Sequence, residues 1–194
     1  MTDVLQYDEA QHAVSVPGRV VPSVTQILQP IDELDGIPLA MLQAAAQFGR
    51  HVHKAIYLHS VGNLNEPLLD AHLVPYLKGW KQFLYDTKAV VQCSERKVHH
   101  RQLRYAGTLD SVLIWKGRKV CDVKSSVGIP RSVGPQLAAY RQAYMLENPE
   151  HHISRTRLCV HLKPDGTYRV QELKDDRDWS IFVSLLNLYR WRNG

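Results

Sequence analysis

The sequence predicts a single α/β domain in which helices flank a mixed sheet. Apolar residues recur with helical spacing over residues 38–59, short β-branched or apolar runs follow after residue 89, and helical spacing returns at Pro135. The chain has 194 residues, of which 44% are hydrophobic, so it is long enough to bury one substantial core but short for two. The predicted order is helices, strands, helix, strands, helix.

The N-terminal part, residues 1–35, is predicted to form an extension to the fold. Residues 5–21 alternate around Gly18 like a β-hairpin, and the apolar residues that follow Ser23 predict a short capped helix. Neither an internal repeat nor a low-complexity tract interrupts the chain, which favours one compact unit.

The remaining elements follow from the same patterns. Residues 36–88 are predicted to be helical, with a second helix over residues 69–85, and residues 89–194 are predicted to hold the sheet and a closing helix. Short apolar runs between polar or glycine-containing turns predict strands over residues 89–93, 105–115, 119–123, 156–161 and 168–173. Helical spacing predicts the last two helices, over residues 135–145 and 179–191.

Composition limits the classes of function. No stretch approaches the roughly 20 apolar residues of a membrane span, and the opening MTDVLQYDEAQH lacks the apolar run of a secretory signal. We therefore expect a soluble cytoplasmic protein with no membrane partner. Three cysteines without a CxxC spacing are expected to be reduced, mostly buried thiols: Cys93, Cys121 and Cys159. The formal charge of +5 modestly favours a polyanionic partner.

The stretch that is most informative about chemistry is GTLDSVLIWKGRKVCDVKSS, residues 107–126. Asp110 lies in one predicted strand, and Asp122 and Lys124 lie in the next. Because alternate side chains of a strand share a face, Asp122 and Lys124 should point the same way while Val123 points into the core. Paired carboxylates suit Mg²⁺, which can activate water and offset phosphate charge. Lys124 would orient that water or, as we prefer, stabilise developing negative charge.

The Asp-x-Lys spacing alone is not specific. Acids also stand two residues before three other lysines, Lys88, Lys97 and Lys174, and a surface salt bridge is the simple alternative for Asp122 and Lys124. Three features distinguish the Asp122 motif, namely its setting in a strand, GTLD upstream across a turn at Gly117, and a downstream helix that carries Gln136 and Tyr140. Residues four apart share a helix face, so both side chains could face one site.

These motifs carry a resemblance to a known superfamily. GTLD, DVK and QLAAY resemble successive motifs of the RecB-like branch of the PD-(D/E)XK nucleases, and GRHVH, residues 49–53, resembles that branch's histidine motif. The opening YDEAQHAVSVPGRVVPSVTQIL is similar to the start of phage-encoded members. Leucine replaces the proline of the PD pair and aspartate replaces the glutamate of the ExK element, and both replacements are common in the superfamily.

The resemblance implies a restriction-endonuclease-like core, with the whole chain forming one nuclease domain. It implies a Mg²⁺-dependent deoxyribonuclease, with Mn²⁺ expected to substitute, that acts as an exonuclease in phage-type recombination or DNA processing. The implied partners are DNA and a recombination protein, and the implied location is the cytoplasm of the host cell. Relatives with an iron–sulfur cluster need four cysteines, and this chain has only Cys159 in the matching region, so no cluster is expected.

The resemblance also assigns roles to individual residues. His53, Asp110 and Asp122 would be metal ligands together with the Val123 carbonyl, and Lys124 would be catalytic. In addition, Gln136 and Tyr140 would bind or orient DNA at the catalytic site. Glu95 falls where several relatives place an extra acid, and it would hold a second metal or order a metal-bound water.

Simpler interpretations stay open for several of these residues. A lone helical histidine such as His53 is usually structural, and Gln136 and Tyr140 could cap the core. A cationic loop before the GTLD strand is predicted either to hold a DNA backbone or to form a solvated strand face; it contains Lys97, His99, His100, Arg101 and Arg104. His99 and His100 are expected to be solvated or to face phosphate.

Three functions compete on this basis. The leading hypothesis is an exonuclease, and a structure-specific or nicking endonuclease is the alternative within the same class, since the active-site residues do not separate the two. A noncatalytic DNA-binding module on the nuclease fold is the alternative from another class, but such a module is expected to lose an acid or the lysine. RNA as the substrate ranks below DNA.

Overall fold

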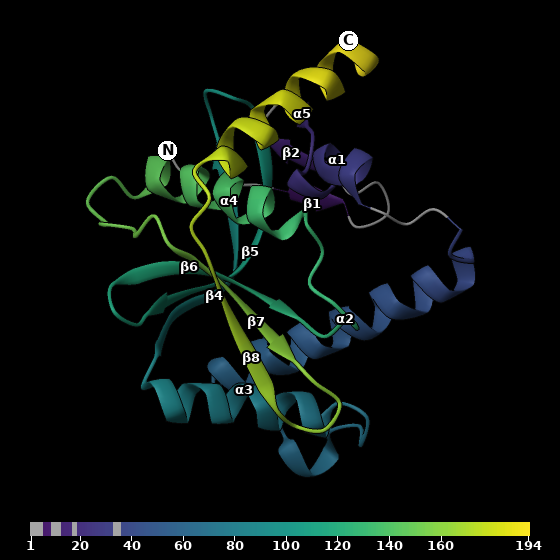
Figure 1. The fold of residues 1–194 in the computed structure, drawn as a ribbon, viewed down its shortest axis with the longest axis vertical. Helices are drawn as coiled ribbons and strands as arrows, with labels where there is room; N and C mark the ends of the chain where they lie inside the picture. Colours follow the sequence, from purple (N-terminus) through teal and green to yellow (C-terminus); the bar gives the residue numbers. More distant parts are fainter. Residues whose placement is uncertain (1–5, 9–12, 17–18, 33–35) are drawn as a thin grey trace.

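A five-stranded mixed sheet forms the centre of the fold (Figure 1). The computed structural model describes residues 6–8, 13–16, 19–32 and 36–194. The strands lie in chain order across the sheet: β4 (Val90–His100), β5 (Tyr105–Ile114), β6 (Arg118–Lys124), β7 (Arg157–Leu162) and β8 (Tyr168–Leu173). Neighbouring strands are antiparallel except β6 and β7, which are parallel. This architecture confirms the predicted α/β fold class with a mixed sheet.

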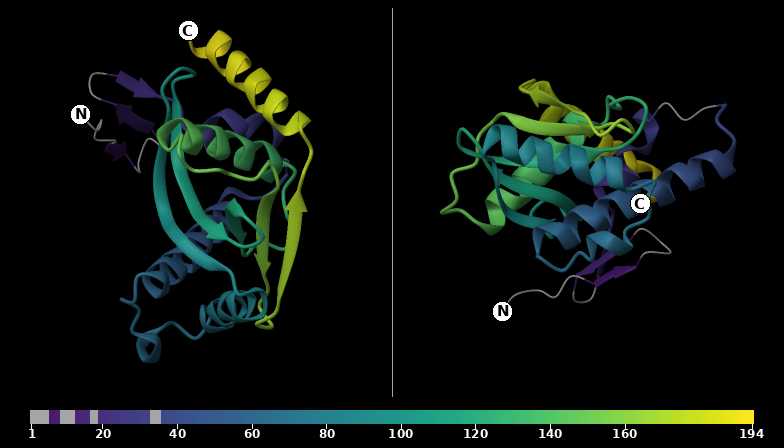
Figure 2. Two further views of the ribbon diagram at one scale, coloured as in Figure 1. Left: turned by 90° about the vertical axis from the view of Figure 1, so that its left-hand side faces the viewer. Right: turned by 90° about the horizontal axis from the view of Figure 1, so that it is seen from below.

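Helices cover both faces of this sheet (Figures 1 and 2). On one side lie α1 (Val24–Leu28), α4 (Val133–Glu147) and α5 (Arg177–Asn193), and on the other lie α2 (Leu39–Ser60) and α3 (Val74–Thr87). Each side has its own apolar cluster, one built around Leu137 and Phe182 and the other around Val52 and Trp80. The sheet is therefore sandwiched, with its central strands buried on both faces.

Strand β6 shows how the sequence produces this arrangement. Successive side chains of a strand point to opposite faces, so Val120 packs into the cluster beneath α4 while Cys121 and Val123 pack into the cluster beneath α2 and α3. The apolar residues of β6 therefore face both sides of the sheet, which suits a strand that is covered on both sides. Two charged residues at its end, the buried Asp122 and the half-buried Lys124, mark the candidate site.

The N-terminal residues form more than the predicted hairpin. Strands β1 (Gln6–Asp8), β2 (Ala13–Val16) and β3 (Arg19–Val21) make a three-stranded antiparallel sheet, of which the β2 and β3 pair corresponds to the prediction. Gly18 lies outside the described residues. The predicted capped helix is α1, where Ser23 and Gln26 form a capping box and Val24, Ile27 and Leu28 are buried in the core.

Several of the predicted bounds need correction. Helix α3 begins at Val74 and not at residue 69, because a 3₁₀ turn, η2 (Glu66–Leu68), comes first and Pro75 lies in the first turn of the helix. Strand β4 continues to His100 and not only to residue 93, since as an edge strand it lacks a clear apolar alternation. Helix α4 begins at Val133, two residues before Pro135. A second 3₁₀ turn, η1 (Gln29–Ile31), follows α1.

Two further expectations concern the membrane and the cysteines. Within the described ranges, no helix combines the length and the apolar character needed to cross a membrane. The three cysteines are free, with Cys121 and Cys159 buried and Cys93 half-buried, which agrees with the predicted buried thiols.

Candidate metal centre

The candidate site lies where β5 and β6 separate. The two strands pair over residues 111–114 and 118–121, and Val123 lies beyond the end of this pairing. The N–H of Val123 donates to Asp110 Oδ2 at 2.8 Å, and its C=O accepts a hydrogen bond from His53 Nε2 at 2.9 Å. Side chains from β5 and α2 therefore satisfy backbone groups that a neighbouring strand would satisfy in a regular sheet.

A third side chain, from β4, joins these two. Glu95 lies across from Asp110, because positions 94 and 96 on either side of it pair with positions 111 and 109. His53 Nδ1 is 3.6 Å from Glu95 Oε1 and 3.5 Å from Asp110 Oδ1. One ligand atom from each of the three residues lies within 4.8 Å of the others. We call His53, Glu95 and Asp110 the metal cluster.

The chemistry of these groups fits a divalent cation. Two carboxylates and one imidazole form a mixed oxygen and nitrogen donor set of the kind that binds Mg²⁺, Mn²⁺ and related ions. The bond from His53 Nε2 to the Val123 carbonyl fixes the imidazole so that Nδ1 faces the two acids, which is how metal-binding histidines are commonly oriented. The structure thus gives the Val123 carbonyl an orienting role, and its role as a direct ligand stays a prediction.

The charge state of His53 reflects this environment. Burial opposes its protonation, but the neighbouring carboxylates of Asp110 and Glu95 outweigh burial and raise the pKa of His53 to about 9. In the absence of a cation, a proton on His53 therefore offsets part of the negative charge of the cluster at neutral pH. A cation that binds through Nδ1 would take the place of this proton.

Asp122 and Lys124 form a pair next to the cluster. As predicted, they share a face of β6, with Lys124 Nζ 2.9 Å from both carboxylate oxygens of Asp122. Burial raises the pKa of Asp122, and Lys124 opposes this rise. Although burial disfavours its charge, Lys124 lies beside Asp122 and Asp110, and these acids raise its pKa, so its ammonium keeps its proton at neutral pH. The structure therefore pairs Asp122 with Lys124, and Glu95 is the acid that joins His53 and Asp110.

The backbone of Glu95 is in an unusual conformation for a strand residue. Its φ is +49°, in the left-handed region that a non-glycine residue adopts at a cost of about 1–2 kcal/mol. The register of β4 with β5 is continuous on both sides of Glu95, and the Glu95 carboxylate lies against His53. Strain of this kind persists where surrounding contacts compensate for it, and it often marks functional positions.

Glu95→Gly should therefore separate stability from metal binding. Glycine adopts a positive φ without strain, so we expect the free energy of unfolding to stay equal or rise by about 1 kcal/mol, while Mn²⁺ affinity falls at least about tenfold with the loss of a ligand. Urea denaturation and calorimetric titration with Mn²⁺ measure the two effects. Lys88→Gly is the matched control, because Lys88 has a φ of +56° at an exposed position outside the cluster. Unchanged Mn²⁺ affinity in Glu95→Gly would remove Glu95 from the ligand set.

Tyr140 lies against the strand that carries Asp110. Its side chain is only 3% exposed, and a Cβ atom added to Gly107 would lie 2.7 Å from Tyr140 Cε1. Gly107 is thus required for the close approach of α4 to β5 at the start of the GTLD motif. Gln136 lies one turn earlier on α4 and is half-buried. The structure brings Tyr140 beside the motif, and the proposed roles of both residues toward DNA stay predictions.

Gly107→Ala should destabilise the fold. The added methyl group forces the buried Tyr140 ring to move, which costs about 1–3 kcal/mol of unfolding free energy in chemical denaturation. Gly128→Ala is the control, since a Cβ there meets nothing within 4 Å. The same Gly107 change in a Tyr140→Leu background should cost less, and equal costs in both backgrounds would show that the clash is not the cause.

The predicted cationic loop is only partly near the site. Lys97 is exposed and pairs with Thr108, two positions along the strands from Glu95 and Asp110. Arg101 and Arg104 are exposed at the tip of the β4–β5 hairpin, and the five strand residues from Glu95 to this tip span roughly 17 Å. Lys97 is therefore the member of this loop that lies nearest to the cluster.

The expectation that His99 and His100 are solvated or face phosphate is wrong. Both residues are buried: His99 is 7% exposed and His100 is 5% exposed. The backbone N–H of His99 donates to Glu147 Oε1 on α4 at 2.7 Å, and the His100 ring stacks on Trp179 of α5. Helices from later in the chain cover this end of β4, which no local pattern around the two histidines could indicate.

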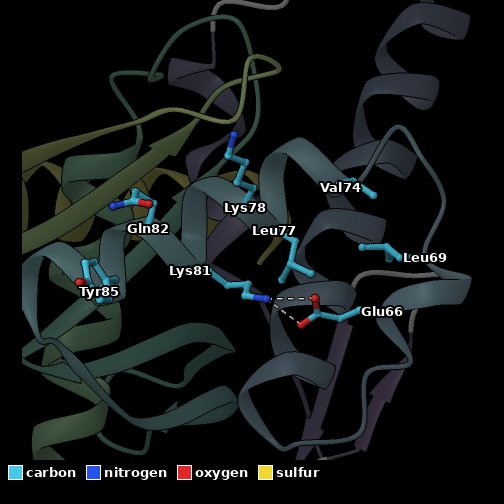
Figure 3. Close-up of a pocket in the computed structure, with 8 residues that line it drawn as sticks. All are labelled: Glu66, Leu69, Val74, Leu77, Lys78, Lys81, Gln82 and Tyr85. Atoms are coloured by element: carbon cyan, nitrogen blue, oxygen red, sulfur yellow. Dashed lines mark hydrogen bonds and ion pairs between the residues drawn. The ribbon is translucent and has the colours of Figure 1, made fainter.

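A pocket also lies along α3, away from these residues (Figure 3). This pocket has a volume of about 440 Å³, and its apolar wall includes Leu69, Val74 and Leu77. An ion pair in its wall joins Lys81 Nζ to both carboxylate oxygens of Glu66 at 3.0 Å. Because these charges satisfy each other, the pocket offers less chemistry than the metal cluster, and we place the functional site at the cluster.

Comparison with protein-family models found no match, and comparison with curated proteins found none either. The fold and the site together define a class of protein, a mixed α/β domain that presents a candidate divalent-cation centre at the divergence of two central strands.

Proposed function

We propose that this chain is a metal-dependent nuclease that hydrolyses phosphodiester bonds in DNA. The observation that carries this proposal is the convergence of the metal cluster with the Asp122 and Lys124 pair around Val123. A site that combines cation ligands with a permanently charged ammonium suits the displacement of an oxygen at an anionic phosphate. The retention of every acid and of the lysine also favours an enzyme over a noncatalytic DNA-binding module.

Each residue has a distinct task in this proposal. A divalent cation held by the metal cluster would offset phosphate charge and activate a water molecule. Lys124 contributes a fixed positive charge that stabilises the negative charge developing on the phosphate oxygens. Asp122 holds the Lys124 ammonium in place through two short contacts. Asp110 and His53 also bind the backbone of Val123, which keeps the separated strands in register.

The distribution of charge around the site supports a polyanionic substrate. Three segments that flank the site residues contain no Asp or Glu: residues 36–65, 96–109 and 123–146. Arg50, Lys54 and Lys97 are exposed cations within these segments. Local positive charge without competing acids raises the concentration of a phosphate polymer near the cluster.

The proposal extends to the kind of nuclease and its place in the cell. The resemblance to RecB-like nucleases favours an exonuclease in recombination or DNA processing, which would act in the cytoplasm, that of the host cell if the protein is phage-encoded. End-labelled linear, nicked and circular DNA substrates with Mg²⁺ test the activity directly. An exonuclease degrades the linear and nicked forms and spares the closed circle, whereas absence of cleavage of all three would overturn the proposal.

The choice of metal gives a second test. We expect Mg²⁺ and Mn²⁺ to support cleavage and Ca²⁺ to support little, because the looser coordination of Ca²⁺ misplaces the attacking water. His53→Ala should raise the Mn²⁺ concentration for half-maximal rate at least about tenfold, and more than it raises that for Mg²⁺, because imidazole prefers the softer ion. His51→Ala on the exposed side of the same helix is the control. Identical titration curves for wild type and His53→Ala would leave His53 with a structural role.

A further inference from the structure

Helix α2 carries a polar stripe that the metal cluster does not use. Gln43, Gln47, Arg50 and Lys54 follow one another at spacings of four, three and four residues, so they line one side of the helix, and all four are exposed. The opposite side is anchored in the core through Val52 and its neighbours. We call these four residues the α2 stripe.

The α2 stripe runs from a projecting end of the helix to the metal cluster. The first half of α2 extends beyond the sheet (Figures 1 and 2), and residues 43–47 are exposed without a gap. Arg50 precedes His53 by three residues, a spacing that makes the two side chains neighbours on the helix surface. The stripe therefore ends where His53 turns toward Glu95 and Asp110.

The chemistry of the α2 stripe is that of a phosphate-binding surface. Two amides and two cations supply hydrogen-bond donors, and no acidic residue occurs between residues 36 and 65. Arginine, lysine and glutamine are common donors to the phosphate oxygens of DNA, where they fix the position of a strand without reading its sequence. From Gln43 to Lys54 the stripe spans about 16 Å, the axial length of about five phosphates along one strand of a duplex.

We propose that the α2 stripe binds the phosphate backbone of one DNA strand and guides it to the metal cluster. This inference rests on the proposed nuclease function and adds the path by which the substrate reaches the site. Lys97 lies on the exposed part of β4 beyond the cluster, so the strand would pass Arg50 and Lys54 before the cluster and Lys97 after it. The path is independent of base sequence.

Binding without cleavage tests the proposed path. Fluorescence anisotropy with a labelled DNA duplex, in Asp110→Asn protein with a chelator present, measures affinity alone. Arg50→Ala with Lys54→Ala should weaken binding at least about tenfold and lower the slope of log affinity against log salt by roughly 1 to 2, because up to two phosphate contacts are lost. Arg155→Ala with Arg192→Ala removes the same charge at exposed positions outside the path, and it should change neither quantity by as much.

The outcomes separate this inference from the proposed function. Equal DNA affinity in the stripe variant and the control variant, with both folded by circular dichroism, would overturn the path. A small chromogenic phosphodiester tests the metal cluster without any DNA path. The wild-type protein should hydrolyse this compound, and Asp110→Asn should not. Hydrolysis of this compound together with unchanged DNA affinity would therefore keep the nuclease proposal and discard the stripe. Weaker DNA binding by the stripe variant, with unchanged binding by the control variant, supports the path.

Discussion

Asp110→Asn should reduce metal-dependent cleavage at least about a thousandfold, the largest effect we expect from a single change. Asp110 Oδ2 accepts the Val123 N–H at 2.8 Å, and Oδ1 faces His53 Nδ1 at 3.5 Å. An asparagine amide oxygen can still accept the Val123 N–H, so the separation of β5 and β6 should survive. The lost negative charge removes a cation ligand, while DNA binding should persist because the positively charged surface is intact.

Three measurements check this prediction. Single-turnover cleavage of end-labelled DNA gives the rate, and anisotropy gives DNA affinity. Titration of the His53 ring by NMR gives a readout independent of activity: Asp110 is one cause of the raised pKa of His53, so the pKa should fall in the variant. Asp86→Asn is the control, since Asp86 is exposed and its hydrogen-bond partners, Gln82 and Tyr168, do not belong to the metal cluster. A folded Asp110→Asn protein with wild-type cleavage would refute the site.

The sequence predicts elements well where the pattern is local. Helix α2 was expected over residues 38–59 and spans Leu39–Ser60, because its own apolar period buries Val52, Ala55 and Ile56. The bounds fail where burial depends on distant segments. Strand β4 is an edge strand whose last residues are covered by α4 and α5, so its own sequence shows no strong alternation and its length was underestimated.

The same distinction applies to the site. The pairing of Asp122 with Lys124 follows from the two-residue period of a strand, and the structure shows it. The approach of Glu95 to His53 depends on a left-handed backbone at Glu95, which has no local signal in the sequence. Only the resemblance to a nuclease family drew attention to Glu95 and His53. The apolar period of α2 predicts a helix but does not indicate which of its exposed polar residues face a ligand.

Lys124→Ala should lower the cleavage rate by roughly a hundredfold to a thousandfold, with little change in metal affinity at a pH where Asp122 is ionised, because Lys124 contributes charge to the transition state and is not a ligand. Asp122 is only 1% exposed, so loss of its partner leaves a buried carboxylate unpaired. Since Lys124 lowers the pKa of Asp122 against the effect of burial, its removal should raise that pKa further. Asp122 then carries a proton up to a higher pH than in the wild type.

The pH dependence makes this prediction specific to the pair. Residual cleavage by Lys124→Ala should appear only at higher pH than wild-type cleavage, because a protonated Asp122 cannot act as the cation ligand that the resemblance implies. Protonation also limits the loss of unfolding free energy to about 1–3 kcal/mol, the cost of an unsatisfied buried polar group.

Lys174→Ala is the matched control, because Lys174 follows Glu172 with the same spacing on the sheet edge, but with its side chain 65% exposed. An exposed pair of this kind contributes little, so Lys174→Ala should leave rate, pH profile and stability near wild type. Equal pH profiles for Lys124→Ala and wild type would show that Asp122 does not depend on Lys124 for its charge.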